Sequence, residues 1–494
     1  MTQKTISEKI REAASHTIVY GLGSVLQAVL GFLLIPLYTK YYSTDLYGVF
    51  ALLTVCATLA GSVFYFGASS ALARSYYDYE DGHERKKTIS TSLYITLAGA
   101  SMQILLGFAL RSELSNILFD TPAYAPHVAV ILCSSALGFL NTLFYLLLRY
   151  ERKSKQVIIL NSLSVILSAS LIIVFLVKFE MGVMAPILGD LINQAFLFVI
   201  LFFLNRRSFV LDASLHELKL QLHFGIPTVL AGFGYYVLSW SDRFFINKFC
   251  SLGDVGVYSL GYKVGAMIHV FFIIPFSQIW APMRMEYRND ANAGELNKLI
   301  LTYYFLTGLV FTVCVSLFAR EILSVLSSRA DYIIAYQVVP FIMVGHLLYG
   351  VINIIDYGIY FKRKIFYHAI IFWGVALLNM AMNGLFVPRI GYMASAYNAV
   401  ITYSLMSLLV FVVSNRLYPM EIDVRRLTKV FAASLPILIA GHWLTQDDGP
   451  EKVLLKGLLV ILQIAILFLF VINKHEKERI RGLIGWRLLK TWKV

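Results

Sequence analysis

Two ionisable side chains lie deep inside long apolar segments of this chain. Asp190 is in the segment 181–204 and Lys263 is in the segment 254–281, each nine residues from the segment's start. At about 1.5 Å per helical residue, that distance places both near the middle of a bilayer whose hydrocarbon core is about 30 Å thick. A charge there costs roughly 2.5 to 3.5 kcal/mol on insertion scales, so each residue is a candidate for binding an ion, a proton or a polar solute.

Asn193 lies about one helical turn after Asp190 and is expected to share its face. The pair predicts a cavity-facing proton or cation site, or a hydrogen-bonding group for a solute. The alternative is a structural hydrogen bond or an ion pair between helices.

Lys263 can likewise be interpreted either as a charge that faces a cavity or as part of a buried ion pair. Gly261 and Gly265 are separated by four residues, a spacing that lets helix backbones approach closely. Lys263 projects to roughly the opposite side at about 100° per residue, where its ammonium can face a cavity. The alternative is a buried ion pair with Asp190 or Asp242.

Four further candidates lie nearer the ends of apolar segments. Asp242 and Arg243 follow Trp240, so Arg243 either faces a solute or extends to the membrane interface beside the tryptophan. Arg74 and Arg149 end their segments, where they either receive an anionic group or fix the topology.

These residues can lie at that depth only on helices that cross the bilayer. A membrane-spanning helix needs about 20 apolar residues, and about fourteen segments of the chain meet this requirement. The predicted spans lie near residues 17–39, 47–74, 88–110, 124–148, 156–177, 181–204, 222–247, 254–281, 299–319, 332–358, 365–387, 392–415, 428–445 and 453–473. The apolar runs are continuous, and backbone groups in lipid must be satisfied within each segment, so we expect an all-α membrane protein.

The composition agrees with a membrane protein. The chain has 494 residues, of which 58% are hydrophobic and 14% charged, whereas soluble proteins carry about 25% charged residues. The longest break, 205–222, is a short polar connector. Most enzyme classes are therefore excluded. The four cysteines have no metal-ligand spacing, so we expect neither a metal nor another cofactor.

The net charge is +13, and the basic residues are concentrated on one side of the membrane. With the N-terminus in the cytoplasm, 31 of the 42 Lys and Arg residues lie on the cytoplasmic side and 9 in the opposite loops. This is the positive-inside pattern, so nucleic acid is not an expected partner. Fourteen spans return the C-terminus to the cytoplasm, where the basic tail 474–494 is predicted to lie on anionic membrane lipid as an amphipathic helix.

The sequence also contains an internal repeat. The matched positions are 47–50 with 255–258 at an offset of 208, and Gly182 with Gly391 and Lys153 with Lys362 at an offset of 209. We therefore predict two pseudo-symmetric six-helix lobes, 1–212 and 213–420, and a region 421–494 with two appended helices and the basic tail. Two lobes related by an axis along the membrane normal could enclose a cavity and expose it alternately to each side.

Several motifs resemble one known family. They are Ile35-Pro36-Leu37-Tyr38, Ser43-Thr44-Asp45-Leu46-Tyr47-Gly48, Gly225-Ile226-Pro227, Asp242-Arg243 and Asp254-Val255-Gly256-Val257-Tyr258-Ser259. In this order and spacing, the chain resembles the polysaccharide transporter family, of the O-antigen flippase type, within the multidrug/oligosaccharidyl-lipid/polysaccharide exporter (MOP) superfamily.

This resemblance implies a flippase that moves an undecaprenyl-diphosphate-linked oligosaccharide from the cytoplasmic to the outer leaflet of the bacterial inner membrane, in lipopolysaccharide or other polysaccharide biosynthesis. Polysaccharide assembly proteins are candidate partners. The diphosphate would need cationic side chains such as Lys263, Arg243 and Arg74. Asp190 would bind a proton or cation or the sugar, and Asn193 and Asp242 are further candidate substrate-binding residues. A proton or sodium ion could drive the transport.

Two other functions compete with this one. A cation-coupled multidrug exporter of the same superfamily would share the duplicated bundle. A membrane-embedded sugar polymerase or ligase would need a large outer loop with catalytic residues. The outer loops here are short and hold no paired carboxylates or nucleophile-base arrangement, so we expect a transporter rather than an enzyme.

Overall fold

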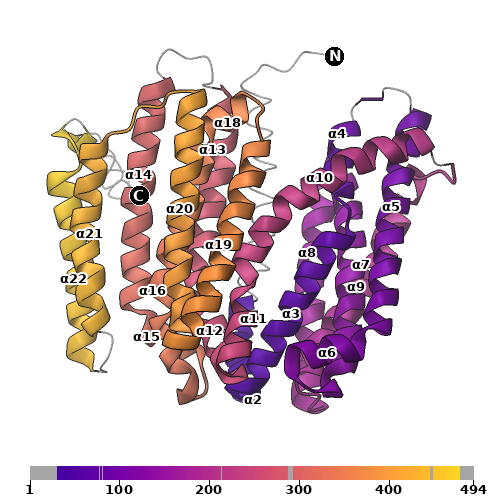
Figure 1. Ribbon diagram of the computed structural model, residues 1–494, viewed down its shortest axis with the longest axis horizontal. Coiled ribbons are helices and arrows are strands. Elements are labelled where there is room, and N and C mark those ends of the chain that lie inside the picture. The colour runs from indigo at the N-terminus through magenta and orange to yellow at the C-terminus, as the bar shows by residue number, and fades with distance from the viewer. Residues whose placement is uncertain are drawn as a thin grey trace, which may run out of the picture. The chain divides into compact units, whose positions relative to one another are not determined.

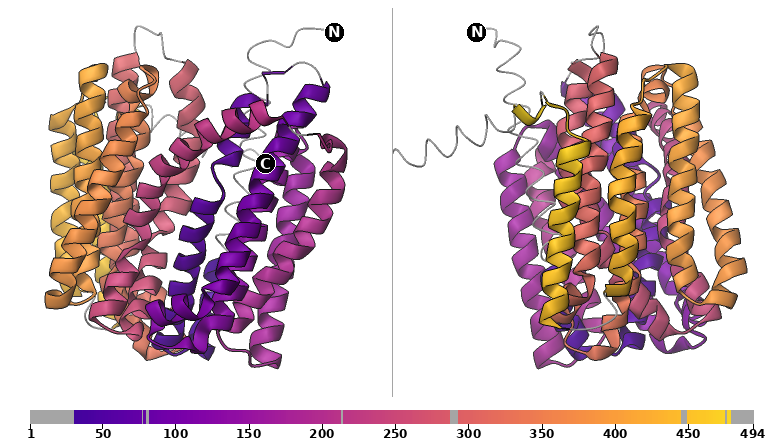
Figure 2. Two further views of the ribbon diagram at one scale, coloured as in Figure 1. Left: turned by 45° about the vertical axis from the view of Figure 1, so that its right-hand side comes forward. Right: turned by 90° about the vertical axis from the view of Figure 1, so that its left-hand side faces the viewer.

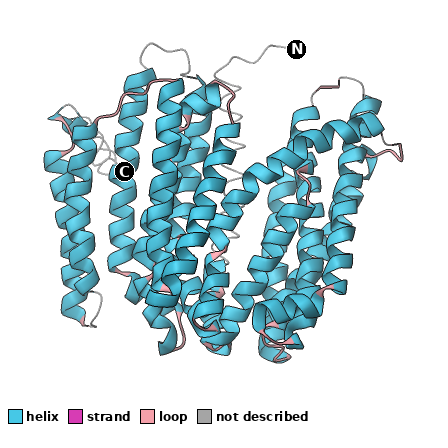
Figure 3. Ribbon diagram, in the orientation of Figure 1, coloured by secondary structure: helices cyan, strands magenta, loops and turns pink. Residues whose placement is uncertain are grey.

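The computed structural model describes residues 31–76, 78–79, 82–212, 214–286, 293–444, 449–474 and 476–478. Within these ranges every regular element is a helix, and no strand is present (Figure 3). Most of the predicted first span, 17–39, and most of the predicted amphipathic tail lie outside the described residues.

The helices follow one another with short connections. In chain order they are α2 (Ile35–Tyr41), α3 (Thr44–Phe64), α4 (Ala68–Ser75), α5 (Gly82–Ala109), α6 (Arg111–Phe119), α7 (Ala125–Tyr150), α8 (Ser154–Ile173), α9 (Met184–Asn205), α10 (Leu215–Trp240), α11 (Asp242–Phe249), α12 (Leu252–Gly265), α13 (Ile274–Glu286), α14 (Ala293–Leu317), α15 (Ala319–Leu326), α16 (Val339–Gly350), α17 (Ile352–Ile355), α18 (Tyr357–Phe361), α19 (Phe366–Ile390), α20 (Met393–Leu417), α21 (Val424–Leu444) and α22 (Pro450–Phe470). Short 3-10 or π-helical segments are η1 (Pro122–Tyr124), η2 (Val174–Lys178), η3 (Arg206–Ser208), η4 (His269–Ile273) and η6 (Ala330–Gln337).

Eleven of the described helical segments are long and apolar enough to cross a membrane. A twelfth is formed if η6 and the helices that follow it, bent by 45°, count as one span. These twelve occupy predicted positions two to twelve and fourteen, and the thirteenth predicted segment is the helix α21. The protein is therefore a multi-pass, all-α membrane protein, while the predicted count of fourteen spans is not confirmed.

The chain forms two compact units. Unit 1 comprises the described residues within 1–260, 325–332 and 364–406, and unit 2 those within 261–324, 333–363 and 407–494. These units cut across the predicted halves, since residues 213–260 and 364–406 pack in unit 1. The division into duplicated lobes at 212 and 420 remains a prediction.

Unit 1 is organised around α7, which packs against α3, α5 and α9 (Figure 1). Its core includes Leu143, Phe144 and Leu147, which are almost completely buried. The helix α10 packs along α19 and also contacts α3, α4 and α5. A close crossing occurs at Gly67, the residue before α4, which has a φ of +67° and lies so near Gly225 of α10 that a Cβ would come within 2.4 Å of its carbonyl oxygen.

Unit 2 is organised around α14, which packs against α16, α21 and α22 (Figure 2). Polar contacts join the last two helices to the rest of the unit. The buried Lys456 of α22 makes an ion pair with Glu321 of α15, and Gln463 of α22 donates to Ser434 of α21 at 2.8 Å. In lipid, where apolar contacts give little driving force, such contacts help to specify which helices associate.

Candidate functional site

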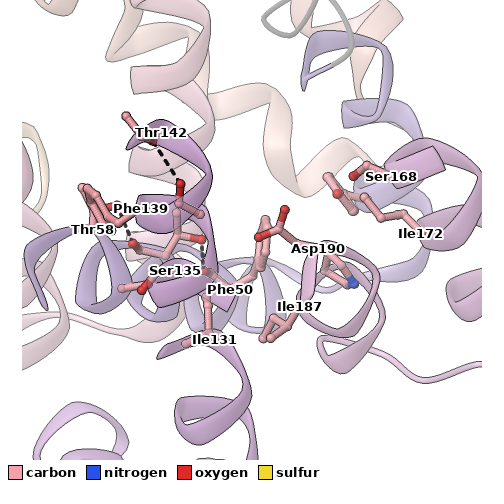
Figure 4. Close-up of a pocket in the computed structure, with 15 residues that line it drawn as sticks. Phe50, Thr58, Ile131, Ser135, Phe139, Thr142, Ser168, Ile172, Ile187 and Asp190 are labelled. Atoms are coloured by element: carbon pink, nitrogen blue, oxygen red, sulfur yellow. Dashed lines mark hydrogen bonds between the residues drawn. The ribbon is translucent and has the colours of Figure 1, made fainter. Parts of the chain in front are cut away.

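Unit 1 contains a cavity of about 460 Å³ among α2, α3, α7, α8 and α9 (Figure 4). Its lining residues are Tyr38, Phe50, Thr54, Ala57, Thr58, Ile131, Ser135, Gly138, Phe139, Thr142, Ser168, Ile172, Pro186, Ile187 and Asp190. Asp190 is the one ionisable carboxylate among them. The cavity is thus apolar over much of its wall, with hydroxyl groups and a single acid.

Asp190 lies on the first turns of α9, between the side chains of α7 and those of α8 (Figure 4). Because α9 begins at Met184 rather than at 181, Asp190 is six residues, or about 9 Å, from the start of its helix. It is therefore nearer the end of the span than the sequence-based boundary placed it.

Neutral donors orient the Asp190 carboxylate. Ser134 donates to Oδ2, and Gln194 donates to Oδ1 at 3.3 Å. Asn141 holds the Gln194 side chain, because its Nδ2 donates to the backbone oxygen and to Oε1 of Gln194 at 2.9 Å each. No cationic side chain of the described part of unit 1 pairs with Asp190, so the carboxylate can accept a proton, a cation or the hydroxyl of a solute.

The threonines of the cavity are arranged as hydrogen-bond acceptors. Thr54 and Thr58 on α3 and Thr142 on α7 each donate their hydroxyl hydrogen to the carbonyl four residues earlier, at 2.8 to 3.0 Å. Their oxygen lone pairs remain for other partners. Together with Asp190, they make a cavity rich in acceptors, suited to a cation or to a solute with many O–H groups.

Asn193 does not line this cavity. It is 3% exposed and donates to Ser164 of α8 at 2.9 Å. Its side chain thus joins α8 to α9, while Asp190 on the same helix reaches the cavity. The expectation that Asn193 shares the face of Asp190 is therefore wrong.

Asp242 and Arg243 are both 2% exposed and have polar partners within unit 1. Asp242 accepts from the Tyr258 hydroxyl at 2.7 Å and from Asn383 of α19 at 2.8 Å. Arg243 donates to the Ser239 carbonyl at 2.8 Å, and its guanidinium lies 4.9 Å from the Trp240 ring centroid. Neither residue lines the Asp190 cavity, and Arg243 does not extend to the surface.

Lys263 and Arg74 differ in their surroundings. Lys263 lies near the end of α12, is partly buried, and has no hydrogen-bond or ion-pair partner among the described residues of unit 2. Its neighbours Gly261 and Gly265 pack tightly against 335–342, as their spacing predicted. Arg74 is exposed on the last turn of α4, and its guanidinium lies 4.9 Å from the Phe224 ring centroid.

Sequence reasoning missed two sets of polar residues. Gln194 and Asn141, which position Asp190, could have been noticed as amides inside apolar segments, with Gln194 one turn after Asp190. Lys456 lies close to the start of the predicted span 453–473, where a lysine is not unusual, yet its side chain is fully buried. Its partner Glu321 lies 135 residues away in the sequence, so no local pattern signals the pair.

The fold is shared with solved membrane transporters. The lipid II flippase MurJ in an inward closed conformation superposes with a TM-score of 0.71 at 17% identity, over 92% of this chain and 98% of that chain. A multidrug resistance MATE family transporter in an inward-facing conformation gives 0.65 at 14% identity, over 82% and 97%. A MOP superfamily transporter from Pyrococcus furiosus gives 0.53 at 14% identity, over 82% and 95%. The fold is therefore that of MOP superfamily transporters.

The family itself follows from the sequence. The family described as polysaccharide biosynthesis protein matches residues 13–288, more than half of the chain, and the chain belongs to this family. No protein with a curated description matches the chain.

Proposed function

We propose that this protein is a flippase that moves an undecaprenyl-diphosphate-linked oligosaccharide repeat unit from the cytoplasmic to the outer leaflet by alternating access. Membership of the polysaccharide biosynthesis family supports the sugar pathway. The fold shared with a lipid II flippase supports transport of a lipid-linked molecule, although a fold by itself assigns no substrate.

The observation that carries the proposal is the acceptor-rich cavity of unit 1. Sugars present many O–H donors, and Asp190 with the cavity's serine and threonine oxygens offers acceptors to them. The volume of about 460 Å³ lies within the usual range for small-molecule sites, about 300 to 1,000 Å³. In this proposal Asp190 contacts sugar hydroxyls or binds the coupling proton or sodium ion.

Within unit 2, Lys263 is the residue we assign to the diphosphate, and within unit 1, Arg74 is assigned as a residue that first receives it. Lys263 has no ion-pair partner among the described residues of unit 2, so its ammonium can neutralise a phosphate. Asp242 and Arg243 are assigned a positioning role instead, because each is satisfied by neighbouring groups of unit 1.

The proposal places the protein in the bacterial cytoplasmic membrane with both termini in the cytoplasm, as the positive-inside pattern predicts. It acts there as a transporter rather than as an enzyme, in contact with membrane lipid and with polysaccharide assembly proteins. A topology assay on cysteine tags at the two ends, with a membrane-impermeant reagent, tests the orientation. Labelling of one tag only in intact cells would contradict it.

The substrate is tested by deleting the gene in its native host and analysing the lipid-linked sugars. We expect completed repeat units to accumulate on the cytoplasmic face of the membrane. Expression of the wild-type chain should restore the normal pool. An unchanged pool of lipid-linked sugars in the deletion strain would overturn the proposal.

A cation-coupled multidrug exporter is the second candidate, and one observation favours it. The wall of the Asp190 cavity also carries apolar side chains, including Phe50, Ile131, Phe139 and Ile187. A single carboxylate in such a wall suits an organic cation. This function predicts that the deletion strain accumulates cationic dyes and becomes drug-sensitive while its lipid-linked sugars stay normal.

A further inference from the structure

A second cavity, of about 600 Å³, lies in unit 1 at the opposite end of α9 from Asp190. Five basic side chains line it: Arg85, Lys86, Lys153, Arg206 and Arg207. The sixteen residues from Asp190 to Arg206 correspond to about 24 Å along the helix. This basic cavity is therefore separate from the acceptor-rich cavity, and it lies at the end of α9 that the positive-inside pattern assigns to the cytoplasm.

The basic cavity has a large excess of positive charge. Among the described residues that line it, Glu151 is the one acid, and its carboxylate accepts from Ser208 at 3.0 Å and pairs with Lys153 at 2.5 Å. No acidic side chain in the described part of the chain pairs with Arg206 or Arg207, and both are exposed. Four of the five cations thus remain to attract an anion.

One of these cations, Arg85, is held in place by a carbonyl and an aromatic ring. Arg85 donates to the Tyr79 carbonyl through Nη2 at 2.7 Å and through Nε at 3.2 Å, and its guanidinium lies 5.5 Å from the Tyr76 ring centroid. Carbonyl and ring contacts hold the guanidinium, and no acidic side chain of the described residues pairs with it. A negatively charged group would meet a partly preorganised partner.

An apolar slot of about 300 Å³ adjoins the basic cavity and shares Arg206 with it. Leu93 and Tyr94 of α5, Phe202 of α9 and the segment 209–211 form its walls. The segment is held against α5, because the backbone N–H of Val210 donates to Ser90 at 2.9 Å and Tyr94 donates to the Leu211 carbonyl at 3.2 Å. A hydrocarbon chain fits such a slot, whereas a soluble anion would leave it unfilled.

We infer that the basic cavity and its apolar slot together bind an anionic phospholipid of the cytoplasmic leaflet. The lipid phosphate lies among Arg206, Arg207 and Lys86, and one acyl chain enters the slot between α5 and α9. Basic pockets between transmembrane helices on the cytoplasmic side suit such headgroups. This site goes beyond the proposed flippase activity and does not depend on what the protein transports.

The experiment is lipid binding to the full chain in detergent, measured by native mass spectrometry with phosphatidylglycerol and with zwitterionic phosphatidylcholine. The test variant is the triple change Lys86→Gln, Arg206→Gln and Arg207→Gln. The matched control is Lys362→Gln, Arg363→Gln and Lys364→Gln, which removes the same charge from another basic loop. Elution of both variants as single species shows that they are folded.

We expect phosphatidylglycerol to bind the wild-type chain and the control, with affinity lower on the order of 100-fold in the test variant, because each Lys or Arg near the headgroup contributes about fivefold. Phosphatidylcholine should bind weakly to all three. Equal loss in both triple variants would mean general charge attraction and would overturn the site, as would no loss in either.

A further arm separates the lipid from its headgroup. Glycerol 3-phosphate, which has the phosphate but no acyl chain, should not displace phosphatidylglycerol at millimolar concentration. The substitution Leu211→Asp, which puts a carboxylate at the slot, should weaken lipid binding. Displacement by glycerol 3-phosphate, or full binding to the Leu211→Asp variant, would show that the slot holds no acyl chain and would reject the lipid assignment.

Discussion

Gly48 of α3 and Gly256 of α12 pack backbone to backbone in unit 1, and the contact is reciprocal. A Cβ on Gly48 would lie 2.0 Å from the Leu252 carbonyl oxygen, and a Cβ on Gly256 would lie 2.0 Å from the Thr44 carbonyl oxygen. Gly48 and Gly256 are 208 positions apart, and so are Thr44 and Leu252, which is the offset of the sequence repeat. Equivalent positions of the two repeats thus meet at one crossing, as a two-fold related pair of helices would.

This crossing predicts that neither glycine tolerates a side chain. Gly48→Ala and Gly256→Ala should each lower the melting temperature in detergent, because overpacking costs about 1 to 3 kcal/mol or more. The matched control is Gly232→Ala on α10, where a Cβ meets nothing within 4 Å and alanine is favoured in a helix by up to about 1 kcal/mol. Equal stability of all three variants would show that the crossing is not tight.

Asp190 and Asn193 should respond differently to substitution. Asp190→Asn should reduce complementation of the deletion strain roughly tenfold to 100-fold at normal protein level, since a charge-assisted contact contributes about 1.5 to 3 kcal/mol. Asn193→Ala should lower stability while sparing transport, because Asn193 bonds Ser164 rather than the cavity. Full transport by Asp190→Asn would remove the residue from the site.

Lys263 should be needed for its charge. Lys263→Gln is expected to abolish complementation with the protein still in the membrane, and Lys263→Arg to retain part of it, because a cation remains. Lys298→Gln on α14, which removes a lysine already paired with Glu295 at 3.3 Å, serves as the control. Transport at wild-type rates by Lys263→Gln would show that no phosphate is bound there.

The Lys456–Glu321 pair should act as a unit. Lys456→Leu should cost about 2 kcal/mol, below the 3 to 5 kcal/mol of a fully buried pair, because Glu321 is 31% exposed. The double variant Lys456→Leu with Glu321→Leu should recover most of the loss, since no unpaired charge is left. Melting temperatures of the two single variants and the double variant give the coupling. Additive losses would mean that the two side chains do not interact.

A pH effect is expected where Arg426, on the first turn of α21, meets Glu476 after α22. Burial alone would raise the pKa of the Glu476 carboxyl, but the Asn473 backbone N–H and the Arg426 guanidinium hold that pKa below its ordinary value. Because the pKa of Glu476 is lower in the folded protein than in the unfolded chain, the ionised carboxylate stabilises the fold at pH values above the ordinary glutamate pKa. This stabilisation is lost as the pH falls through the lowered pKa of the folded protein.

The melting temperature of Glu476→Gln should therefore lie below that of the wild type at pH 7. The difference in melting temperature between the variant and the wild type should shrink as the pH falls below about 4, where it passes the ordinary glutamate pKa. Glu295→Gln, at an exposed pair, should change little at any pH. A difference that persists unchanged in acid would show that the carboxylate charge is not involved.

The sequence by itself determined that the chain is helical and crosses a membrane many times, and where most of the spans lie. The reason is physical: lipid admits only segments of about 20 apolar residues whose backbone bonds are internal. The same cost of burial marked Asp190 and Lys263 as unusual, and the glycine spacing at 261 and 265 predicted a close helix contact that the structure contains.

Only the tertiary structure decided which buried polar groups reach a cavity. Asp190 and Asn193 lie three residues apart, yet one faces the cavity and the other faces Ser164, because the result depends on the rotation of α9 against α7 and α8. Asp242 is satisfied by Asn383, and Lys456 by Glu321, both more than 100 residues away. The pattern of apolar residues along the sequence predicts which side chains are buried. Which polar groups bond to one another depends on how helices distant in the sequence pack together.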